Sequence, residues 1–143
     1  MLQSIHARLS ARLTAPDWVD VEVAEDIDRL GEMIGLTHGT GAIIMPYRER
    51  ADSQSLASGG FRQRITVQFM TVIVQNEPVG LLGAERAGRF DALKHQIEAA
   101  LAGWEPDGCI QPCELVDGES SPFSPGVSFY LHTWQTARFL TGA

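Results

Sequence analysis

The chain has 143 residues and a net charge of −7 at pH 7, with 44% hydrophobic and 20% charged residues. This length and composition indicate one globular domain that is large enough for a core of its own. The acidic balance argues against a protein that binds nucleic acid through phosphate contacts, and two cysteines are too few for a disulfide framework. No apolar run approaches the roughly 18 residues of a membrane span.

The first third of the chain predicts two helices and two short strands. Residues 2–13 have the apolar spacing of an amphipathic helix, which must stop before Pro16. Residues 18–23 alternate valine with acidic residues, which indicates a strand with one face in solvent. Acidic residues then open a second helix over 25–35, and residues 42–45 read as a buried strand ended by Pro46.

Residues 48–60 hold few apolar side chains and predict a loop. A loop of this length is uncommon inside a compact domain, and such loops are often functional. The expected organisation is therefore a single domain over residues 1–143 with a long functional loop at 48–60.

The centre of the fold is expected to begin with an extended run over residues 61–74. Ile65, Val67 and Phe69 share one face of this run, and the opposite face is polar at first and apolar from Met70 onward. The strand should thus be half exposed at its start and buried on both faces at its end. It exceeds the usual strand of about five or six residues, so its arginine-bearing start should project from the domain.

A helix is expected to cover this strand. After a break at residues 76–78, residues 88–104 place apolar side chains three and four positions apart, with Gly103 near the C-terminal end.

The last third predicts strands. Residues 110–116 suit an edge strand because Pro112 cannot donate to a ladder, and residues 117–126 read as a turn-rich connection. Residues 127–140 form a second long extended run with aromatic side chains on both faces. The whole order predicts an α+β fold in which helices cover a mainly antiparallel or mixed β-sheet with long strands.

The sequence offers little for a metal site. Cys109 and Cys113 lie four residues apart, and only the isolated His95 and His132 could complete a set of ligands. A zinc site usually needs two closely spaced ligand pairs, so two ordinary thiols are the favoured interpretation.

Catalytic motifs are also missing from the sequence. Residues 38–41 resemble a phosphate-binding loop but lack its lysine and precede a strand, which favours a tight turn. The acidic residues of 17–28 are explained by a solvated strand face and the first turn of a helix. No serine lies in a nucleophile elbow. We therefore expect no enzyme activity, no metal and no cofactor.

Several short features, taken in order, resemble the tail-terminator proteins of long-tailed bacteriophages. An N-terminal helix ends near Pro16 and is followed by a valine-rich strand and a short helix. A Ser/Gly-rich loop precedes Gly59–Gln63, an alanine-rich helix end precedes Gly103–Gly108, and an aromatic C-terminal strand contains Trp134–Thr136. The resemblance covers nearly the whole chain, and it departs from the family at residues 75–88, where an Asn/Asp-rich turn is common.

The resemblance implies a ring, typically a hexamer, on the head-proximal end of the tail tube. Such a ring stops tube polymerisation and joins the tail to the head connector, so the implied partners are further copies of the chain, the tail tube protein and the head–tail connector protein. DNA would only pass through the lumen, which suits an acidic protein. The implied location is the neck of the virion, after assembly in the host cytoplasm, without any membrane.

Two other function classes stay open at this point. Another phage neck or head-completion protein, a connector or stopper, would share the size, the acidity and the lack of catalytic motifs. A small ligand-binding domain or an enzyme is the third class. Electron microscopy of the particles would separate rings from plain particles and monomers.

Four arginines are the candidate contact residues. Arg62 and Arg64 lie two positions apart on the polar start of the long strand and should point the same way. Arg48 and Arg50 lie across the predicted loop and could join them. They form either a solvated strand end or an interface with acidic groups on the next subunit or on the tail tube.

Overall fold

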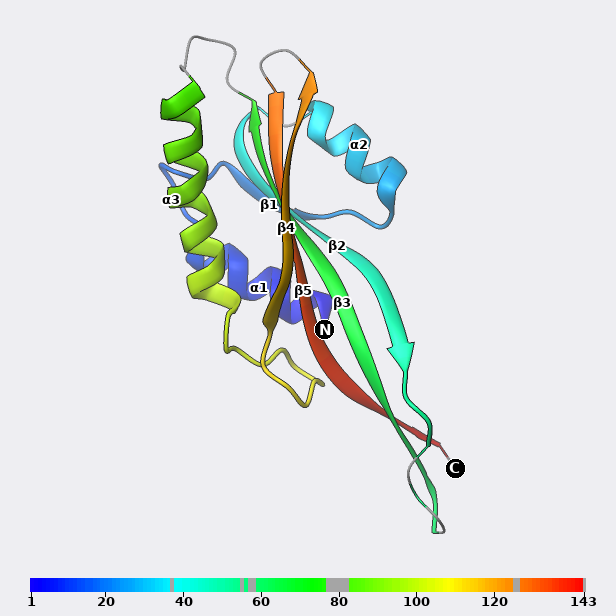
Figure 1. Ribbon diagram of the computed structural model, residues 1–143. Coiled ribbons are helices and arrows are strands. Elements are labelled where there is room, and N and C mark those ends of the chain that lie inside the picture. The colour runs from blue at the N-terminus through cyan, green and yellow to red at the C-terminus, as the bar shows by residue number, and fades with distance from the viewer. Residues whose placement is uncertain (37, 55, 57–58, 77–82, 125–126, 143) are drawn as a thin grey trace.

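A computed structural model shows three helices around a five-stranded sheet (Figure 1). It describes residues 1–36, 38–54, 56, 59–76, 83–124 and 127–142. The elements in chain order are α1 (Leu2–Arg12), β1 (Asp20–Val23), α2 (Ile27–Leu36), β2 (Gly39–Ala51), β3 (Phe61–Asn76), α3 (Gly83–Leu101), β4 (Glu114–Ser124) and β5 (Val127–Gly142). The predicted α+β class and the predicted order of elements are confirmed.

The sheet is mixed and mainly antiparallel. Its strand order is β1-β2-β3-β5-β4, and only the short β1–β2 pair is parallel. The two longest strands, β3 and β5, lie side by side in the middle and pair along their whole length, from Phe61 with Gly142 to Asn76 with Val127.

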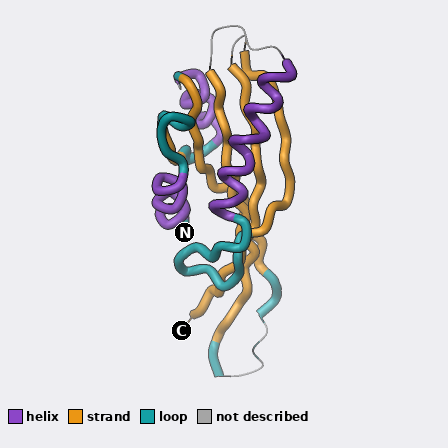
Figure 2. The backbone as a smooth tube through the Cα atoms, turned by 90° about the vertical axis from the view of Figure 1, so that its left-hand side faces the viewer, coloured by secondary structure: helices purple, strands orange, loops and turns teal. Residues whose placement is uncertain are grey.

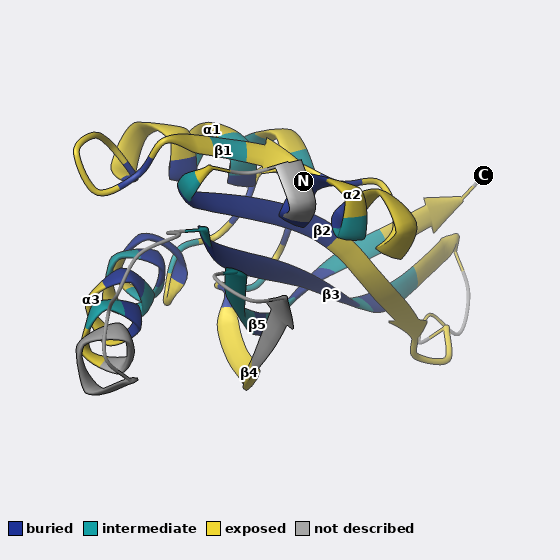
Figure 3. Ribbon diagram, turned by 90° about the horizontal axis from the view of Figure 1, so that it is seen from above, coloured by how far each residue is buried: buried dark blue, intermediate teal, exposed yellow. Residues whose placement is uncertain are grey.

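Alternation along β3 produces two cores, one on each face of the sheet. One face carries Phe69 and Ile73, which join a cluster built from α1, α3 and Trp134 of β5. The other face carries Met70, Val72 and Val74, which pack against α2. The predicted burial of both faces at the end of this strand is confirmed. Seen from above, α1 and α3 lie on one face of the sheet, and α2 lies on the other face beside the buried part of β2 (Figure 3).

Helix α3 runs alongside the sheet (Figure 2). Its buried side chains follow the predicted spacing: Phe90, Leu93, Ile97, Ala100 and Leu101. The helix starts at Gly83, earlier than the predicted residue 88, and Gly103 follows its end with a φ of +78°. That conformation ends helices at low cost when the residue is glycine. Over the described residues, no helix is long and apolar enough to cross a membrane. Residues 77–82, which include most of the predicted break, lie outside the described part.

Three strands continue past the helices and form a projecting arm (Figure 1). We define the arm as Pro46–Ala51 of β2, Phe61–Thr66 of β3 and Arg138–Gly142 of β5. Within it β3 pairs with β5 along its length, and β2 joins β3 where Arg50 and Ala51 pair with Thr66 and Ile65. β2 is exposed from Pro46 onward, and β3 is exposed or half-buried from Phe61 to Arg64. The predicted projection of the start of β3 is therefore confirmed.

The prediction of a loop over 48–60 was wrong at its beginning. β2 does not end at Pro46 but continues to Ala51, so Arg48–Ala51 belong to a strand. The register shifts between Pro46 and Arg48, and such an irregularity accommodates a proline that cannot donate to the ladder. Pairing with β3 then keeps these polar residues extended, which their own composition does not predict.

The predicted edge strand over 110–116 exists, but its predicted bounds were wrong. The edge strand is β4, Glu114–Ser124, and it occupies much of the predicted turn-rich connection at 117–126. Pro112 lies before the strand, and Glu114–Ser120 are all exposed. A strand with solvent on both sides carries no alternating apolar pattern. Pairing with β5, rather than local periodicity, therefore makes this segment extended.

The valines of the predicted strand over 18–23 are less buried than expected for a strand that has only one face in solvent. Val19 is 69% exposed and Val23 is 38% exposed, although they alternate with the acidic residues as predicted. β1 is a short edge strand, and neither face is fully covered within one chain. This leaves aliphatic surface at the β1 edge of the sheet.

Candidate assembly interface

The register places all four predicted arginines on one face of the arm. Arg48 pairs with Gln68, and Arg50 pairs with Thr66, so both share a face with Arg62 and Arg64 on β3. This is also the face that α2 covers farther up the sheet, beyond the end of the arm. The structure therefore brings together residues that the sequence separates by a loop. We call this the arginine face.

Arg62 and Arg64 do not point freely into solvent. The guanidinium of Arg62 stacks 3.7 Å from the ring centre of Phe139 on β5. Arg64 donates to the side chain of Gln111 and to Thr66 Oγ1, and it lies 3.7 Å from Asp52 Oδ2. Both side chains are thus held in place by their own chain, which was not expected from the sequence.

Arg48 and Arg50 occupy the more open part of the arginine face. Arg48 Nε donates to Gln68 Oε1 at 2.8 Å, and Gln68 in turn donates to Gln135 Oε1 at 3.1 Å. These side chains, with Glu49, Arg50 and Thr66, line a polar groove across β2, β3 and β5. The guanidinium groups of Arg48 and Arg50 in this groove suit carboxylates of a partner.

The opposite face of the arm carries an ion pair that sequence reasoning missed. Arg138 Nε and Nη2 donate to the two carboxylate oxygens of Glu49 at 2.9 and 3.0 Å. The pair joins β5 to β2 across β3, and hydrogen bonding to Arg138 lowers the pKa of Glu49. The two residues are far apart in sequence, so no local signal announces the contact. It ties the three strands of the arm together.

A second charged surface lies along β1 and α2. Residues 17–32 contain seven acidic residues and one basic residue, Arg29. We call this surface the acidic edge; its acidic members, all exposed, are Asp17, Asp20, Glu22, Glu25, Asp26, Asp28 and Glu32. Val19 and Ile27 lie among these acidic residues and are 69% and 70% exposed, respectively. A surface that mixes carboxylates with aliphatic side chains suits a protein partner better than solvent alone.

Carboxylates on the acidic edge crowd one another. The pKa of Glu22 is raised, chiefly by a hydrogen bond with the Asp20 side chain and further by desolvation and by the charge of Asp20. Two carboxyl groups this close resist carrying two full charges. A cation placed beside them would relieve that repulsion.

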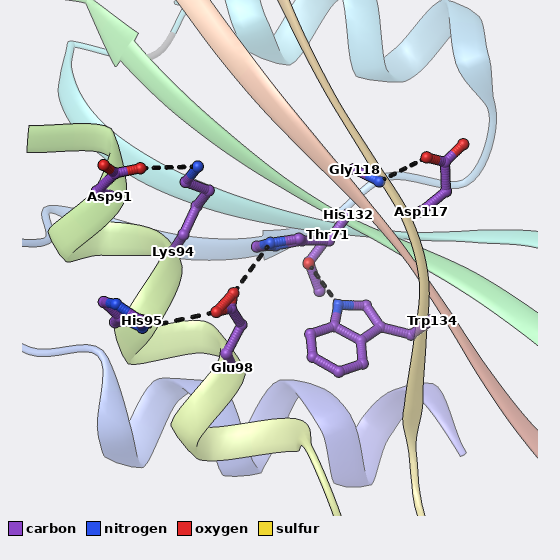
Figure 4. A network of polar contacts seen from close by, with 9 residues as sticks. All are labelled: Thr71, Asp91, Lys94, His95, Glu98, Asp117, Gly118, His132 and Trp134. Atoms are coloured by element: carbon purple, nitrogen blue, oxygen red, sulfur yellow. Dashed lines mark hydrogen bonds and ion pairs between the residues drawn. The ribbon is translucent and has the colours of Figure 1, made fainter. Parts of the chain in front are cut away.

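The interior holds a polar cluster between α3 and β5, drawn in Figure 4. His132 Nε2 lies 3.7 Å from Glu98 Oε2, and Trp134 Nε1 donates to Thr71 Oγ1 at 3.0 Å. Burial, aided by the charge of Lys94, lowers the pKa of His132 to about 4. His132 is 1% exposed, so a substrate has no access to it from solvent in this structure. We interpret the cluster as part of the core.

The cysteines do not have the character of nucleophiles. Both are free and buried, and burial raises the pKa of Cys113 to about 12. A reactive thiol needs the opposite shift, toward the thiolate. Among the described residues, no three His, Cys, Asp or Glu side chains are placed to hold a metal ion. Cys109, Cys113, His95 and His132 thus do not gather into the metal site considered from sequence.

Comparison with known proteins gives one family and one overall fold. A family model described as "Phage tail terminator protein" matches residues 1–142. A chain from a solved structure titled "Virion of native gene transfer agent (GTA) particle" is similar at 12% identity with a TM-score of 0.56. The match covers 99% of this chain and 95% of that one, and at this identity it shows a shared fold. No curated protein sequence gives a significant match.

Proposed function

Because the chain belongs to the phage tail terminator protein family, we propose that it forms a closed homo-oligomeric ring, a hexamer, on the head-proximal end of the tail tube. The family supports a structural role in a phage tail, and it favours the first of the three function classes considered from the sequence. In this proposal the ring ends tube polymerisation and joins the tail to the head connector. DNA passes through its lumen, and assembly takes place in the host cytoplasm.

The observation that carries the proposal is the projecting arm. Its three strands extend past the helices and expose Tyr47, Phe61 and Leu140 by 51%, 37% and 41%. An exposed β-structure of this kind readily associates with other chains. Closed cyclic symmetry satisfies such surfaces and leaves no end that goes on polymerising. Surfaces rather than a catalytic cleft would then perform the function.

Purified tails provide the test. Tails made with the protein should carry a ring at one end in electron micrographs, and native mass spectrometry of the released ring should give a hexamer. Tails from lysates that lack the protein should be over-long or unable to join heads. Isolated single subunits on normal tails would contradict the proposal.

Reversing two arginines of the arm should impair function while the fold stays intact. The variant R62E/R64E loses the contacts with Phe139 and Gln111, which we expect to cost about 1 kcal/mol or less in unfolding free energy because the side chains are only partly buried. If these arginines face a partner, the reversal brings like charges together there and can cost several kcal/mol of binding.

Complementation of lysates lacking the terminator measures this effect. R62E/R64E should yield over-long tails or unjoined heads, whereas R12E, a reversal of an exposed arginine on α1, should restore normal tails. Thermal melting of both variants controls for folding. Normal tail length and titre with R62E/R64E would assign these arginines to a solvated strand end.

A further inference from the structure

We propose that the arginine face of one copy docks on the acidic edge of the next copy, so that two different surfaces of the chain form the contact within the ring. The inference rests on the proposed function and names the surfaces that the ring would join. Its first basis is charge. The arginine face carries Arg48, Arg50, Arg62 and Arg64, whereas residues 17–32 carry seven acidic residues against one basic residue. In a chain of net charge −7 these are two surfaces of opposite charge on the same molecule.

The second basis is the repulsion already present on the acidic edge. Asp20 and Glu22 lie two positions apart on β1, so their side chains share one face, and the pKa of Glu22 is raised, chiefly by its hydrogen bond with the Asp20 side chain. A guanidinium from another copy would relieve the repulsion between the two carboxylates and donate hydrogen bonds to them. Arg29, the only basic residue of 17–32, lies 3.0 Å from Glu32, and its charge only partly offsets the raised pKa of Glu22.

The third basis is the match of apolar groups that accompany the charges. Among the described residues, Val19 and Ile27 are the most exposed large hydrophobic side chains, at 69% and 70%. On the arm, Tyr47 is 51% exposed and lies under the guanidinium of Arg48, 5.3 Å from its ring centre. The Tyr47 ring can contact aliphatic side chains and the Arg48 guanidinium can pair with carboxylates, so together they suit a surface on which aliphatic and acidic side chains alternate.

At Val21 the β1 edge offers no free backbone groups to an added strand. The Val21 amide donates to Asp20 Oδ1 at 2.9 Å, and the Val21 carbonyl is 2.9 Å from His6 Nε2. The backbone groups of β1 at this position are thus satisfied by the chain itself. At this position a partner meets side chains rather than backbone groups, and the arginine face offers side-chain donors.

Two unlike surfaces on each copy associate head to tail. Such contacts generate a ring when the rotation closes, whereas a surface that pairs with itself yields a twofold dimer. The occupant of the acidic edge is therefore a second copy of this chain. Binding of the arginine face to the tail tube protein is the competing outcome, and the experiments below separate the two.

A charge exchange tests the contact. R48E/R50E and E22R/E25R should each lower the amount of terminator on purified tails by about tenfold or more, because each places like charges opposite one another. The combined four-residue variant should recover to within about threefold of the wild type. As a matched control, D117R/E119R reverses two exposed acids on β4 and should not rescue R48E/R50E. Failure of E22R/E25R to rescue, or equal rescue by the β4 variant, would overturn the inference.

Cross-linking decides the same question without relying on rescue. Chains carrying R50C and chains carrying E25C are prepared separately, mixed and treated with a short bis-maleimide, both free and on tails. We expect a mixed dimer at about tenfold or more the yield of the pair R50C and E119C. The native cysteines are 8% and 2% exposed, and wild-type chains set the background. Equal yields, or cross-links to the tube protein alone, would reject the contact.

The two proposals can fail separately. Tails that carry no terminator ring with wild-type protein would reject the proposed function, and cross-linking of the free chains would still decide the surface. Tails with a normal ring but no preferred R50C–E25C cross-link would reject only the contact.

Discussion

Replacing Trp134 by alanine should lower the free energy of unfolding by about 3 to 5 kcal/mol, the usual range for a large buried aromatic side chain. Trp134 is 0% exposed in the middle of β5 and is the largest fully buried side chain among the described residues. Its ring belongs to the core between the sheet and the helices α1 and α3. Removing it leaves a cavity that this close-packed region cannot fill, and it leaves Thr71 Oγ1 without its donor.

Urea or thermal denaturation followed by circular dichroism measures the effect. The melting temperature of W134A should fall by roughly 10 °C or more. The variant W134F keeps most of the apolar volume and should lose less stability than W134A. As a control, Y47A removes an aromatic side chain that is 51% exposed on the arm, and it should change the melting temperature little. A W134A protein as stable as Y47A would contradict the described core.

Acid should destabilise the fold through His132. Its pKa in the folded chain is lowered from 6.5 to about 4, first by burial and then by the charge of Lys94. The fold therefore favours the neutral imidazole, and protonation favours unfolding. The stability contribution is complete above pH 6.5 and is lost as the pH falls toward 4. The whole shift corresponds to about 3 kcal/mol.

The groups that face His132 do not reverse this sign. Glu98 lies 3.7 Å from His132 Nε2, but the positive charge of Lys94, on the same helix as Glu98, disfavours a charged imidazole (Figure 4). Within the described residues, His132 Nδ1 has no hydrogen-bond partner. The variant H132F removes the titration and keeps a planar ring. Its stability should depend less on pH between 6.5 and 4 than that of the wild type.

Two comparisons show whether the pH dependence comes from His132: an exposed histidine, His95, and a carboxylate, Glu49. H95Q changes a histidine whose side chain is 83% exposed, and its pH dependence should follow the wild type. Glu49, whose pKa is lowered from 4.5 by Arg138, contributes a loss of stability only as the pH falls below about 4.5, because its charged form is the favoured one in the fold. An H132F protein with the wild-type slope between pH 6.5 and 4 would show that His132 is not the responsible group.

Residue patterns in the sequence were sufficient for most of the helices and for the long strands. The alternation around Phe69 predicted burial on both faces of β3, and the spacing of Leu93, Ile97 and Leu101 predicted the covering helix. These patterns are local, because side chains of one element that share a face repeat at a fixed period. The resemblance to tail terminators, carried by the order of short features, agrees with the family match over residues 1–142.

Only the tertiary structure decided where β2 ends, which residues form β4 and which side chains surround the arginines. Arg48–Ala51 and Glu114–Ser120 are strands because β3 and β5 hold them, and their exposed side chains carry no period that could be read in advance. Sequence placed Arg62 and Arg64 on one face of a strand. The register of β2 against β3 added Arg48 and Arg50 to that face, and it set Glu49 on the opposite one, within reach of Arg138. Pairing between strands that are far apart in sequence determines these neighbours, and the local sequence of either strand does not encode that pairing.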